Sequence, residues 1–478
     1  MTARTSETPG DTPHYERLSA VDRTLLNVED ANVHMHVGAV GTYDIAPLRN
    51  AQGTLDVDRL RDSVASTLHQ TPRLRQRLAW IPLFGHPIWV DDDRFDLRYH
   101  VRHSALPPPG DERQLKRLAG RIMSHPLDRG KPLWEMWLVE GLADDRFAVI
   151  VKAHHCMVDG VSGLGTIASM MRPDEERVIE PAPPWAPRPQ PDPATLLRDE
   201  MLHRASALGD LVAIGRRALV APMDTLGSLR ESVLSLAETV GAGLRRGSPT
   251  PLNVAIGPHR RIDWVRIDLA AIRTVRQRFG GTVNDVVLAC TAGALGRFLE
   301  RRGGHPDELV FRSMVPVNTR RDGAVALGNQ VTFVVADLPV GERDPVQRLG
   351  RMRATMDELK RSRQVAGMDL LERVSDEVMP ILFEEFARLG YQQRVYNMAV
   401  TNVPGPPIRL FLQGAPLREI YPVVPVFGQQ ALSVGLFGYN GVLHWGFNCD
   451  WDVLPDLHDI VLDVTDEFEQ LRRLAAGD

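Results

Sequence analysis

The pattern of apolar and polar positions predicts a chain in which strands and helices follow one another irregularly. Residues 36–45 and 146–154 (HVGAVGTYDI and RFAVIVKAH) have the apolar density and β-branched content of strands. Residues 57–70 place Leu60, Val64 and Leu68 on one side of a helix. Further strands are expected at 135–141, 261–269, 308–318 and 329–339, and further helices from Ser19 and at 112–127, 161–171, 270–280, 282–303 and 456–471. This mixture predicts an α/β protein of the mixed-sheet α+β type.

Two tight turns stand out in this pattern. In ALSVGLFGYNGVLHWGFNCD, 431–450, two apolar strands flank Asn440-Gly441, the pair favoured in two-residue hairpin turns. A short polar turn at 143–145 joins the strands expected at 135–141 and 146–154. The strand at 146–154 therefore begins at a second hairpin turn, and its C-terminal end runs into the stretch KAHHCMVDG.

One segment cannot be a helix or a central strand. PAPPWAPRPQPDP, 181–193, has seven prolines in thirteen residues and is expected to be a semi-rigid linker. After it, residues 194–246 predict two amphipathic helices with a break near Ala221-Pro222. These helices could pack between domains, or they could form a surface that faces a membrane or lipid droplet.

Composition narrows the class of protein. A chain of 478 residues is too long for one ordinary core, so two or three domains are expected. The net charge of −5 gives no reason to expect a nucleic-acid partner. Three distant cysteines predict no disulfide framework and suit a cytoplasmic protein. The polar N-terminus does not resemble a signal peptide, and no apolar run approaches the roughly 18–20 residues of a membrane span, so any membrane contact is expected to be peripheral.

The stretch KAHHCMVDG, 152–160, concentrates candidate chemistry at the end of a strand. Because side chains alternate along a strand, His154 and His155 should point to opposite faces. Adjacent His-His-Cys on extended backbone cannot converge on one metal ion, and no second Cys/His cluster lies elsewhere, so a metal site is disfavoured. A single neutral histidine could act as a general base, with Asp159 orienting it or bracing the loop. The residues alone leave this hypothesis and a purely structural strand end both open.

The surrounding sequence resembles a known family. HHCMVDG matches the His-His-x-x-x-Asp-Gly signature of the CoA-dependent acyltransferase superfamily. Five further blocks, in order and spacing, are similar to the bacterial wax ester synthase/diacylglycerol acyltransferase family: PLWEMWLVEGL at 132–142, TVNDVVLA at 282–289, RSMVPVNTR at 312–320, GNQVTF at 328–333 and TNVPGPP at 401–407. The resemblance covers residues 17–472.

This resemblance implies two chloramphenicol-acetyltransferase-like domains with a tunnel between them. It suggests a disordered tail at 1–16, an N-terminal domain at 17–180, a linker with amphipathic helices at 181–255 and a C-terminal domain at 256–478. The implied reaction transfers a fatty acyl group from acyl-CoA, a substrate rather than a cofactor, to diacylglycerol or a long-chain alcohol. The alternatives are a relative that esterifies a polyketide-derived or other specialised alcohol, and a degenerate lipid-binding protein.

The resemblance also assigns roles to individual residues. His155 matches the general base and His154 a supporting residue. Asp159 matches a structural residue paired with an arginine, for which Arg312 is the candidate, and Gly160 would permit the close turn.

The other blocks imply residues around the substrate. Asn284 and Asp285 are expected to face the tunnel, at a helix start where Thr282 is the expected N-cap. Pro132, Leu133 and Trp134 would shape the acyl pocket or belong to the core, and Asn402 and Gly405 would form a turn near the tunnel, with Gly405 in a structural role.

Overall fold

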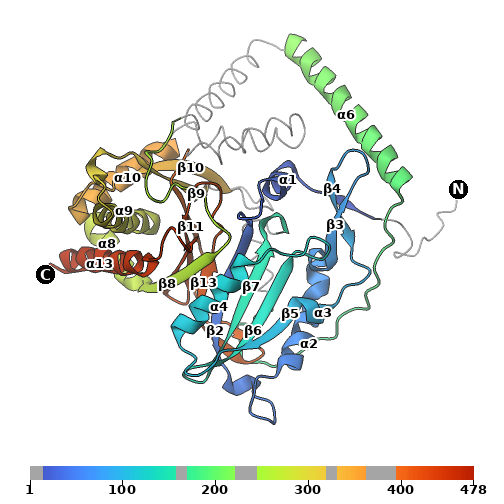
Figure 1. The fold of residues 1–478 in the computed structure, drawn as a ribbon, viewed down its shortest axis with the longest axis horizontal. Helices are drawn as coiled ribbons and strands as arrows, with labels where there is room; N and C mark the ends of the chain where they lie inside the picture. Colours follow the sequence, from blue (N-terminus) through green and yellow to red (C-terminus); the bar gives the residue numbers. More distant parts are fainter. Residues whose placement is uncertain (1–13, 158–169, 221–244, 319–330, 362–394, 478) are drawn as a thin grey trace.

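The structure is a computed structural model that describes residues 14–157, 170–220, 245–318, 331–361 and 395–477. Two six-stranded mixed sheets, each with its own helices, make up the body of the molecule (Figure 1). The predicted mixed α/β class is confirmed.

The N-terminal sheet carries the candidate histidines on a central strand. Its strand order is β12-β13-β2-β7-β6-β5. β7 is antiparallel to both neighbours, and its last residue, His154, pairs with His36 of β2. The strands are β12 (Phe411–Leu412), β13 (Ala415–Val423), β2 (His36–Asp44), β7 (Arg146–His154), β6 (Trp134–Leu142) and β5 (Val101–Ala105).

Helices cover both faces of this sheet. Buried residues of α2 (Val57–Thr67) pack on one face, with α3 (Leu97–His100) nearby. Those of α4 (Glu112–Ser124) pack on the other face. Leu60, Val64 and Leu68, which the pattern placed on one side of a helix, are all buried in the α2 core.

The second sheet has helices on one face. Its order is β10-β9-β11-β14-β15-β8, in which β11 is parallel to both neighbours. The strands are β8 (Arg260–Asp268), β9 (Phe311–Asn318), β10 (Val331–Leu338), β11 (Met398–Val403), β14 (Leu432–Tyr439) and β15 (Val442–Asp450). Its helices, α8 (Leu269–Phe279), α9 (Val283–Arg301), α10 (Pro345–Arg361) and α13 (Leu457–Ala476), lie together beside the sheet in Figure 1.

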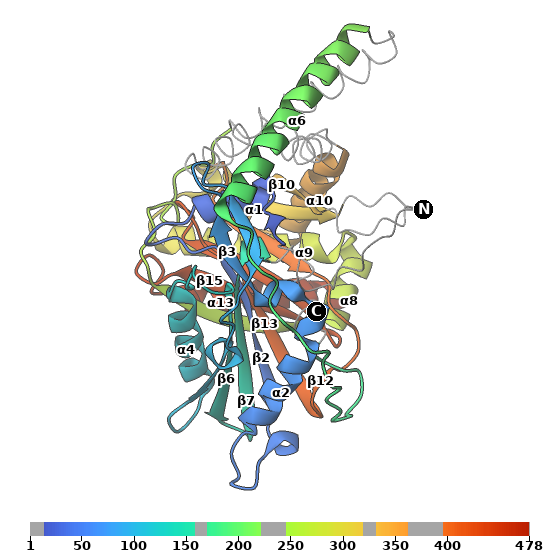
Figure 2. The ribbon, with the colours of Figure 1, turned by 90° about the vertical axis from the view of Figure 1, so that its right-hand side faces the viewer.

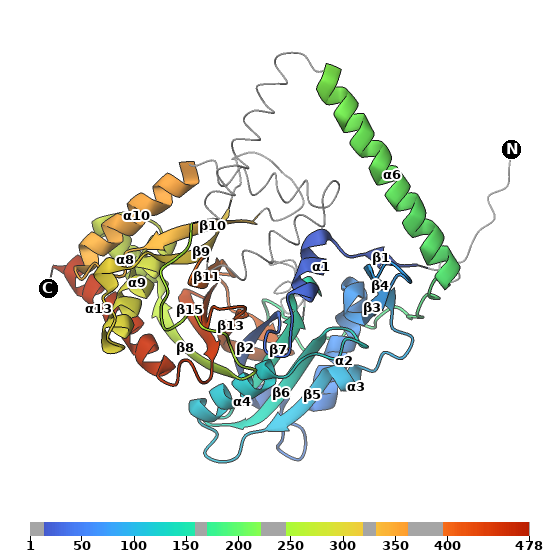
Figure 3. The same cartoon turned by 45° about the horizontal axis from the view of Figure 1, so that its top comes forward.

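A small third sheet sits beside the start of a long projecting helix. Its order is β1-β4-β3, from β1 (Glu16–Arg17), β4 (Pro87–Asp91) and β3 (Gln76–Trp80). It lies beside α1 (Ala20–Asn27) and the first turns of α6 (Pro193–Val220) in Figure 3. Figure 2 shows α6 extending away from the body.

Strands from the C-terminal half complete the N-terminal sheet. β13 pairs with β2 although nearly 400 residues separate them, and β12 pairs with β13. The residues 411–423 lie within the range 256–478 that was assigned to a C-terminal domain. The division by sequence range is therefore not a division between sheets.

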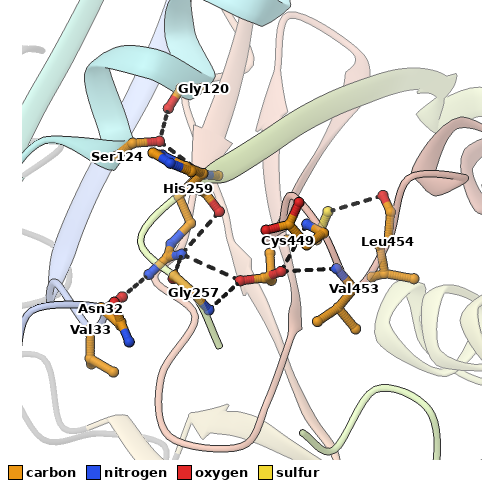
Figure 4. Close-up of polar contacts among 12 residues, drawn as sticks. Asn32, Val33, Gly120, Ser124, Gly257, His259, Cys449, Val453 and Leu454 are labelled. Atoms are coloured by element: carbon orange, nitrogen blue, oxygen red, sulfur yellow. Dashed lines mark hydrogen bonds and ion pairs between the residues drawn. The ribbon is translucent and has the colours of Figure 1, made fainter. Parts of the chain in front are cut away.

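A buried arginine joins the two halves at the start of β8. The main-chain N–H of Arg260 donates to Ser124 Oγ (2.8 Å) at the end of α4. Its guanidinium donates to the carbonyl oxygens of Asn32 and Gly257, the latter at 2.7 Å, and lies 4.0 Å from Asp450. Figure 4 shows these contacts converging from both halves. Beside them, α4 shares a hydrophobic core with β8 and β13.

Most elements that the sequence predicts are present. Ser19 and Thr282 cap α1 and α9, and Asn440 and Gly441 form the expected turn with positive φ at both residues (46° and 82°). Residues 181–192 form neither helix nor strand, and α6 follows from Pro193. The break expected at Ala221-Pro222 lies outside the described residues. The helix expected at 161–171 and the second amphipathic helix fall mainly on residues outside those described.

Candidate active site

The two histidines lie where β7 ends and a short 3-10 turn, His155–Met157, begins. The main-chain N–H of His154 donates to the carbonyl of Leu133 (2.9 Å), just before β6. The N–H of His155 donates to the carbonyl of Met35 (2.8 Å), just before β2. Both neighbouring strands therefore hold the backbone that carries the proposed base.

His154 has a structural environment. Its side chain is buried, and its Nδ1 accepts a hydrogen bond from the main-chain N–H of Cys156 (3.1 Å). The neutral ring must then carry its proton on Nε2. Nε2 lies 3.1 Å from Oε1 of Glu29, an ion-pair distance, although the angle is not that of a hydrogen bond. The predicted supporting role of His154 fits these contacts.

Glu29, which the sequence analysis did not single out, ties the turn to the loop before β2. Its Oε1 accepts from the main-chain N–H of Met35 (2.7 Å), and its Oε2 accepts from Arg129 (2.7 Å). Burial by itself raises the pKa of Glu29, but His154, Arg129 and the Met35 N–H together lower that pKa to about 2. Glu29 is thus ionised, and through Met35 it connects to the backbone of His155. No local pattern marks this residue, because its side-chain partners Arg129 and His154 come from distant segments.

His155 is electrostatically suited to act as a base. Burial lowers the pKa of its imidazole below the ordinary value, and the nearby His154 lowers it further. A hydrogen bond to the residue's own backbone acts in the opposite direction but does not cancel the shift. The ring is therefore neutral near pH 7 and able to accept a proton.

Cys156 is not suited to act as a nucleophile. Its side chain is buried with Leu18 and Leu133, and burial raises the pKa of the thiol strongly. Because the thiolate is the reactive form, this cysteine is chemically inert near neutral pH.

The Asp159–Arg312 pair stays a prediction. Asp159 and Gly160 lie outside the described residues. Arg312 lies on β9 and is buried, with its guanidinium 3.2 Å from Asp337 Oδ1 and donating to the carbonyl of Val395 (2.9 Å). These contacts fit the structural role expected of Arg312.

Asp285 contributes to the cap of α9 through one of its two carboxylate oxygens. Its Oδ2 accepts from the N–H of Thr282 (2.7 Å), and its own N–H donates to Thr282 Oγ1 (3.2 Å), which completes a capping box. Its Oδ1 is buried and has no hydrogen-bond partner within the described parts of the chain. Asn284, next to it, is half-buried. The capping role is confirmed, and the tunnel-facing role stays a prediction.

The block at 132–134 packs in the core. Pro132 and Leu133 are buried, and Trp134 donates its indole N–H to the carbonyl of Leu74 (2.8 Å) and stacks on His100 at 4.6 Å. Leu133 also accepts the hydrogen bond from the His154 backbone. These contacts favour the core interpretation over direct contact with an acyl chain.

The block at 401–407 lies against β14. Asn402 is half-buried on β11 and pairs with Leu436. A Cβ added at Gly405 would lie 2.2 Å from the carbonyl oxygen of Gly438, so only glycine permits this close approach. The structural role predicted for Gly405 fits this packing.

The two sheets and the histidine turn define the class of protein. The chain has the two-domain fold of CoA-dependent acyltransferases and condensation domains. The first condensation domain of the calcium-dependent antibiotic synthetase superposes with a TM-score of 0.59, covering 97% of this chain and 96% of that one. At 16% identity this likeness concerns the fold alone.

Sequence comparison places the chain more closely. Residues 18–287 match the wax ester synthase/diacylglycerol acyltransferase catalytic domain, and residues 327–472 match the C-terminal domain of the same family. The chain belongs to the wax ester synthase/diacylglycerol acyltransferase family, and it is an acyltransferase.

Two relatives are similar over almost their whole length. A protein of Mycobacterium tuberculosis named as a probable diacylglycerol O-acyltransferase is 31% identical over 463 residues, covering 95% of each chain. The structure of the wax ester synthase/diacylglycerol acyltransferase from Marinobacter aquaeolei VT8 superposes with a TM-score of 0.70 at 26% identity. It covers 96% of this chain and 100% of that one.

Proposed function

We propose that this protein transfers a long-chain fatty acyl group from acyl-CoA to the hydroxyl of diacylglycerol, of a long-chain alcohol, or of both. The observation that carries the proposal is a neutral, partly buried His155 on a turn held by both neighbouring strands, in a member of this family. The products would be triacylglycerol and wax ester.

The proposed step is a direct transfer between two bound substrates. His155 accepts the proton of the acceptor hydroxyl as its oxygen attacks the thioester carbonyl. The tetrahedral intermediate then loses the C–S bond, and the departing CoA sulfur takes the proton from the imidazolium. No electrons are exchanged and the proton is returned, so the step requires neither a redox cofactor nor a covalent enzyme intermediate.

We further propose that the protein meets its lipid substrates at a cytoplasmic membrane face or at a lipid droplet. Diacylglycerol and long-chain alcohols partition into lipid rather than water. In the described parts of the chain, no helix combines the length and the apolar character needed to span a bilayer. Peripheral binding is the mode that fits both points.

The direct test measures free CoA released from palmitoyl-CoA, with dioleoylglycerol or hexadecanol as acceptor and with the lipid product identified. We expect acceptor-dependent CoA release that falls by roughly 10²–10⁴-fold in His155→Ala, the range for loss of a general base. The melting temperature of the variant should stay close to that of the wild type. Activity of His155→Ala at the wild-type rate would contradict the assignment of the base, and an absence of CoA release from the wild type with either acceptor would contradict the function.

A further inference from the structure

The tip of the β3–β4 hairpin, residues 80–86, exposes large apolar side chains. Trp80, Leu83 and Phe84 are 48%, 90% and 37% exposed. The loop itself is well formed, because the N–H of Ile81 donates to the carbonyl of His86 (2.9 Å) and the N–H of Gly85 donates to the carbonyl of Ile81 (2.9 Å). The structure thus holds apolar groups in water on a defined turn.

Leu83 is unfavourable at its position on two counts. Its φ of 65° lies in the left-handed region, which disfavours a leucine and favours glycine or asparagine. Its side chain also gains nothing by packing, since it is almost fully exposed. Folding stability does not explain a leucine here, and a backbone outlier of this kind points to a function.

The adjoining side of α6 extends this surface. The guanidinium of Arg204, which also pairs with Glu200, lies 4.3 Å over the ring of Phe84. Met201, three residues earlier and therefore on the same side of the helix, is 58% exposed. Beneath them, Ile81, Ile88, Val90 and Leu196 form a buried cluster that fastens the hairpin tip to the first turns of α6.

The hairpin is also packed against the catalytic turn. Leu78 of β3 and Trp89 of β4 share a hydrophobic cluster with Leu26 of α1 and with Cys156, the residue after His155. Leu83 follows Leu78 by five residues, beyond the end of β3 at Trp80. The hairpin that carries the tip is therefore joined to the catalytic turn through one hydrophobic cluster.

We infer that the hairpin tip, together with the Met201 and Arg204 side of α6, binds a phospholipid surface. The inference rests on the proposed function, because the acceptor lipid resides in such a surface. Leucine, phenylalanine and methionine enter the acyl layer. Tryptophan and arginine lie at the headgroup level, where an amphipathic ring and a cation are both favoured.

The test compares three proteins for binding to phosphatidylcholine/phosphatidylglycerol vesicles by co-sedimentation, without acyl-CoA. Wild type should bind, and Leu83→Asn should bind about tenfold more weakly, as expected for removing one leucine from an apolar phase. Because asparagine tolerates positive φ, the melting temperature of Leu83→Asn should be unchanged or higher. Leu462→Asn is the matched control. Leu462 is also exposed, to 51%, but it lies on α13, at the other side of the molecule (Figure 1).

Activity measurements separate this inference from the proposed function. Transfer to a short, water-soluble alcohol should be the same in wild type and Leu83→Asn, while transfer to dioleoylglycerol in vesicles should fall about tenfold. A wild type that acylates the soluble alcohol but does not bind vesicles would overturn the inference alone. Equal vesicle binding by Leu83→Asn would also overturn it. A lower molecular mass of Leu83→Asn than of wild type, measured by sedimentation without lipid, would overturn the inference as well. The tip would then be an interface between two copies of the chain.

Discussion

At the scale of single residues, the catalytic turn depends on a carboxylate far away in the sequence. Glu29 bonds to the Met35 N–H, and the Met35 carbonyl bonds to the N–H of His155. The same carboxylate faces His154 and Arg129. Glu29 is therefore a positioning residue, which acts on the base through the backbone and through His154.

This role predicts a specific pH dependence for Glu29→Gln. The wild-type pKa of about 2 lies below the unfolded value near 4.5, so the stabilisation is complete above about pH 4.5 and is lost as pH falls toward 2. The variant should lose on the order of 3 kcal/mol at pH 7, and the difference from wild type should vanish near pH 2. Denaturant unfolding of wild type and variant over this pH range measures the difference in stability.

The same variant should also affect turnover. Because the backbone of His155 is held less firmly, we expect kcat to fall about tenfold, a factor equal to about 1.4 kcal/mol of barrier, while the KM for acyl-CoA changes little. Glu180→Gln, at an exposed position, is the matched control. A parallel drop of kcat in the control, or an unchanged kcat in Glu29→Gln, would argue against the positioning role.

At the scale of secondary-structure elements, β7 holds α4 through a buried lysine. Lys152 donates from Nζ to the carbonyls of Ile122 (3.0 Å) and His125 (2.8 Å), at the C-terminal end of α4, where a cation is favoured. Burial lowers the pKa of Lys152 to about 8, although the carboxylate of Glu135 acts to raise it. The contact orients the helix that packs against β8 of the other half.

Lys152→Met should destabilise the protein in a pH-dependent way. The carbonyls of Ile122 and His125 lose their donor, and for the buried Ile122 carbonyl this costs roughly 1–3 kcal/mol at pH 7. The folded pKa lies below the unfolded value near 10.5, so wild type binds fewer protons when folded between pH 8 and 10.5. Its stability relative to the variant should therefore rise over that window. Unfolding curves of both proteins at pH 7 and pH 10 test this. If the unfolding free energy of wild type minus that of the variant shrinks as the pH rises, the prediction is contradicted.

At the scale of the whole molecule, neither half is complete without the other. β13 forms ladder bonds with β2, and the core around α4 contains Trp264 of β8 and Tyr421 of β13, which stack at 4.8 Å. The contacts of Arg260 add a polar junction between the halves (Figure 4). The two sheets are therefore interdependent although they form separate layers.

This arrangement predicts that residues 1–255 do not fold alone. Without β13, strand β2 would become an exposed edge, and part of the α4 core would face water. We expect the fragment to show no cooperative thermal unfolding by circular dichroism. Co-expression with residues 256–478 should give a soluble complex that a tag on one fragment recovers. A soluble, cooperatively unfolding 1–255 fragment would contradict the prediction.

The sequence by itself determined the local elements. The strand at 146–154, the Asn440-Gly441 turn and the Thr282 cap are encoded by neighbouring residues, and these predictions were confirmed. The alternation argument assumed that both histidines lie on the strand, but β7 ends at His154 and His155 begins a 3-10 turn.

Only the tertiary structure decided which distant groups meet. Glu29 beside His154, β13 beside β2 and Arg260 between the halves join segments more than a hundred residues apart. Short β12 and the irregular β13 also carry weak local signals. Periodicity reports which face of an element is apolar, but not which partner covers it, because that choice depends on packing across the whole chain.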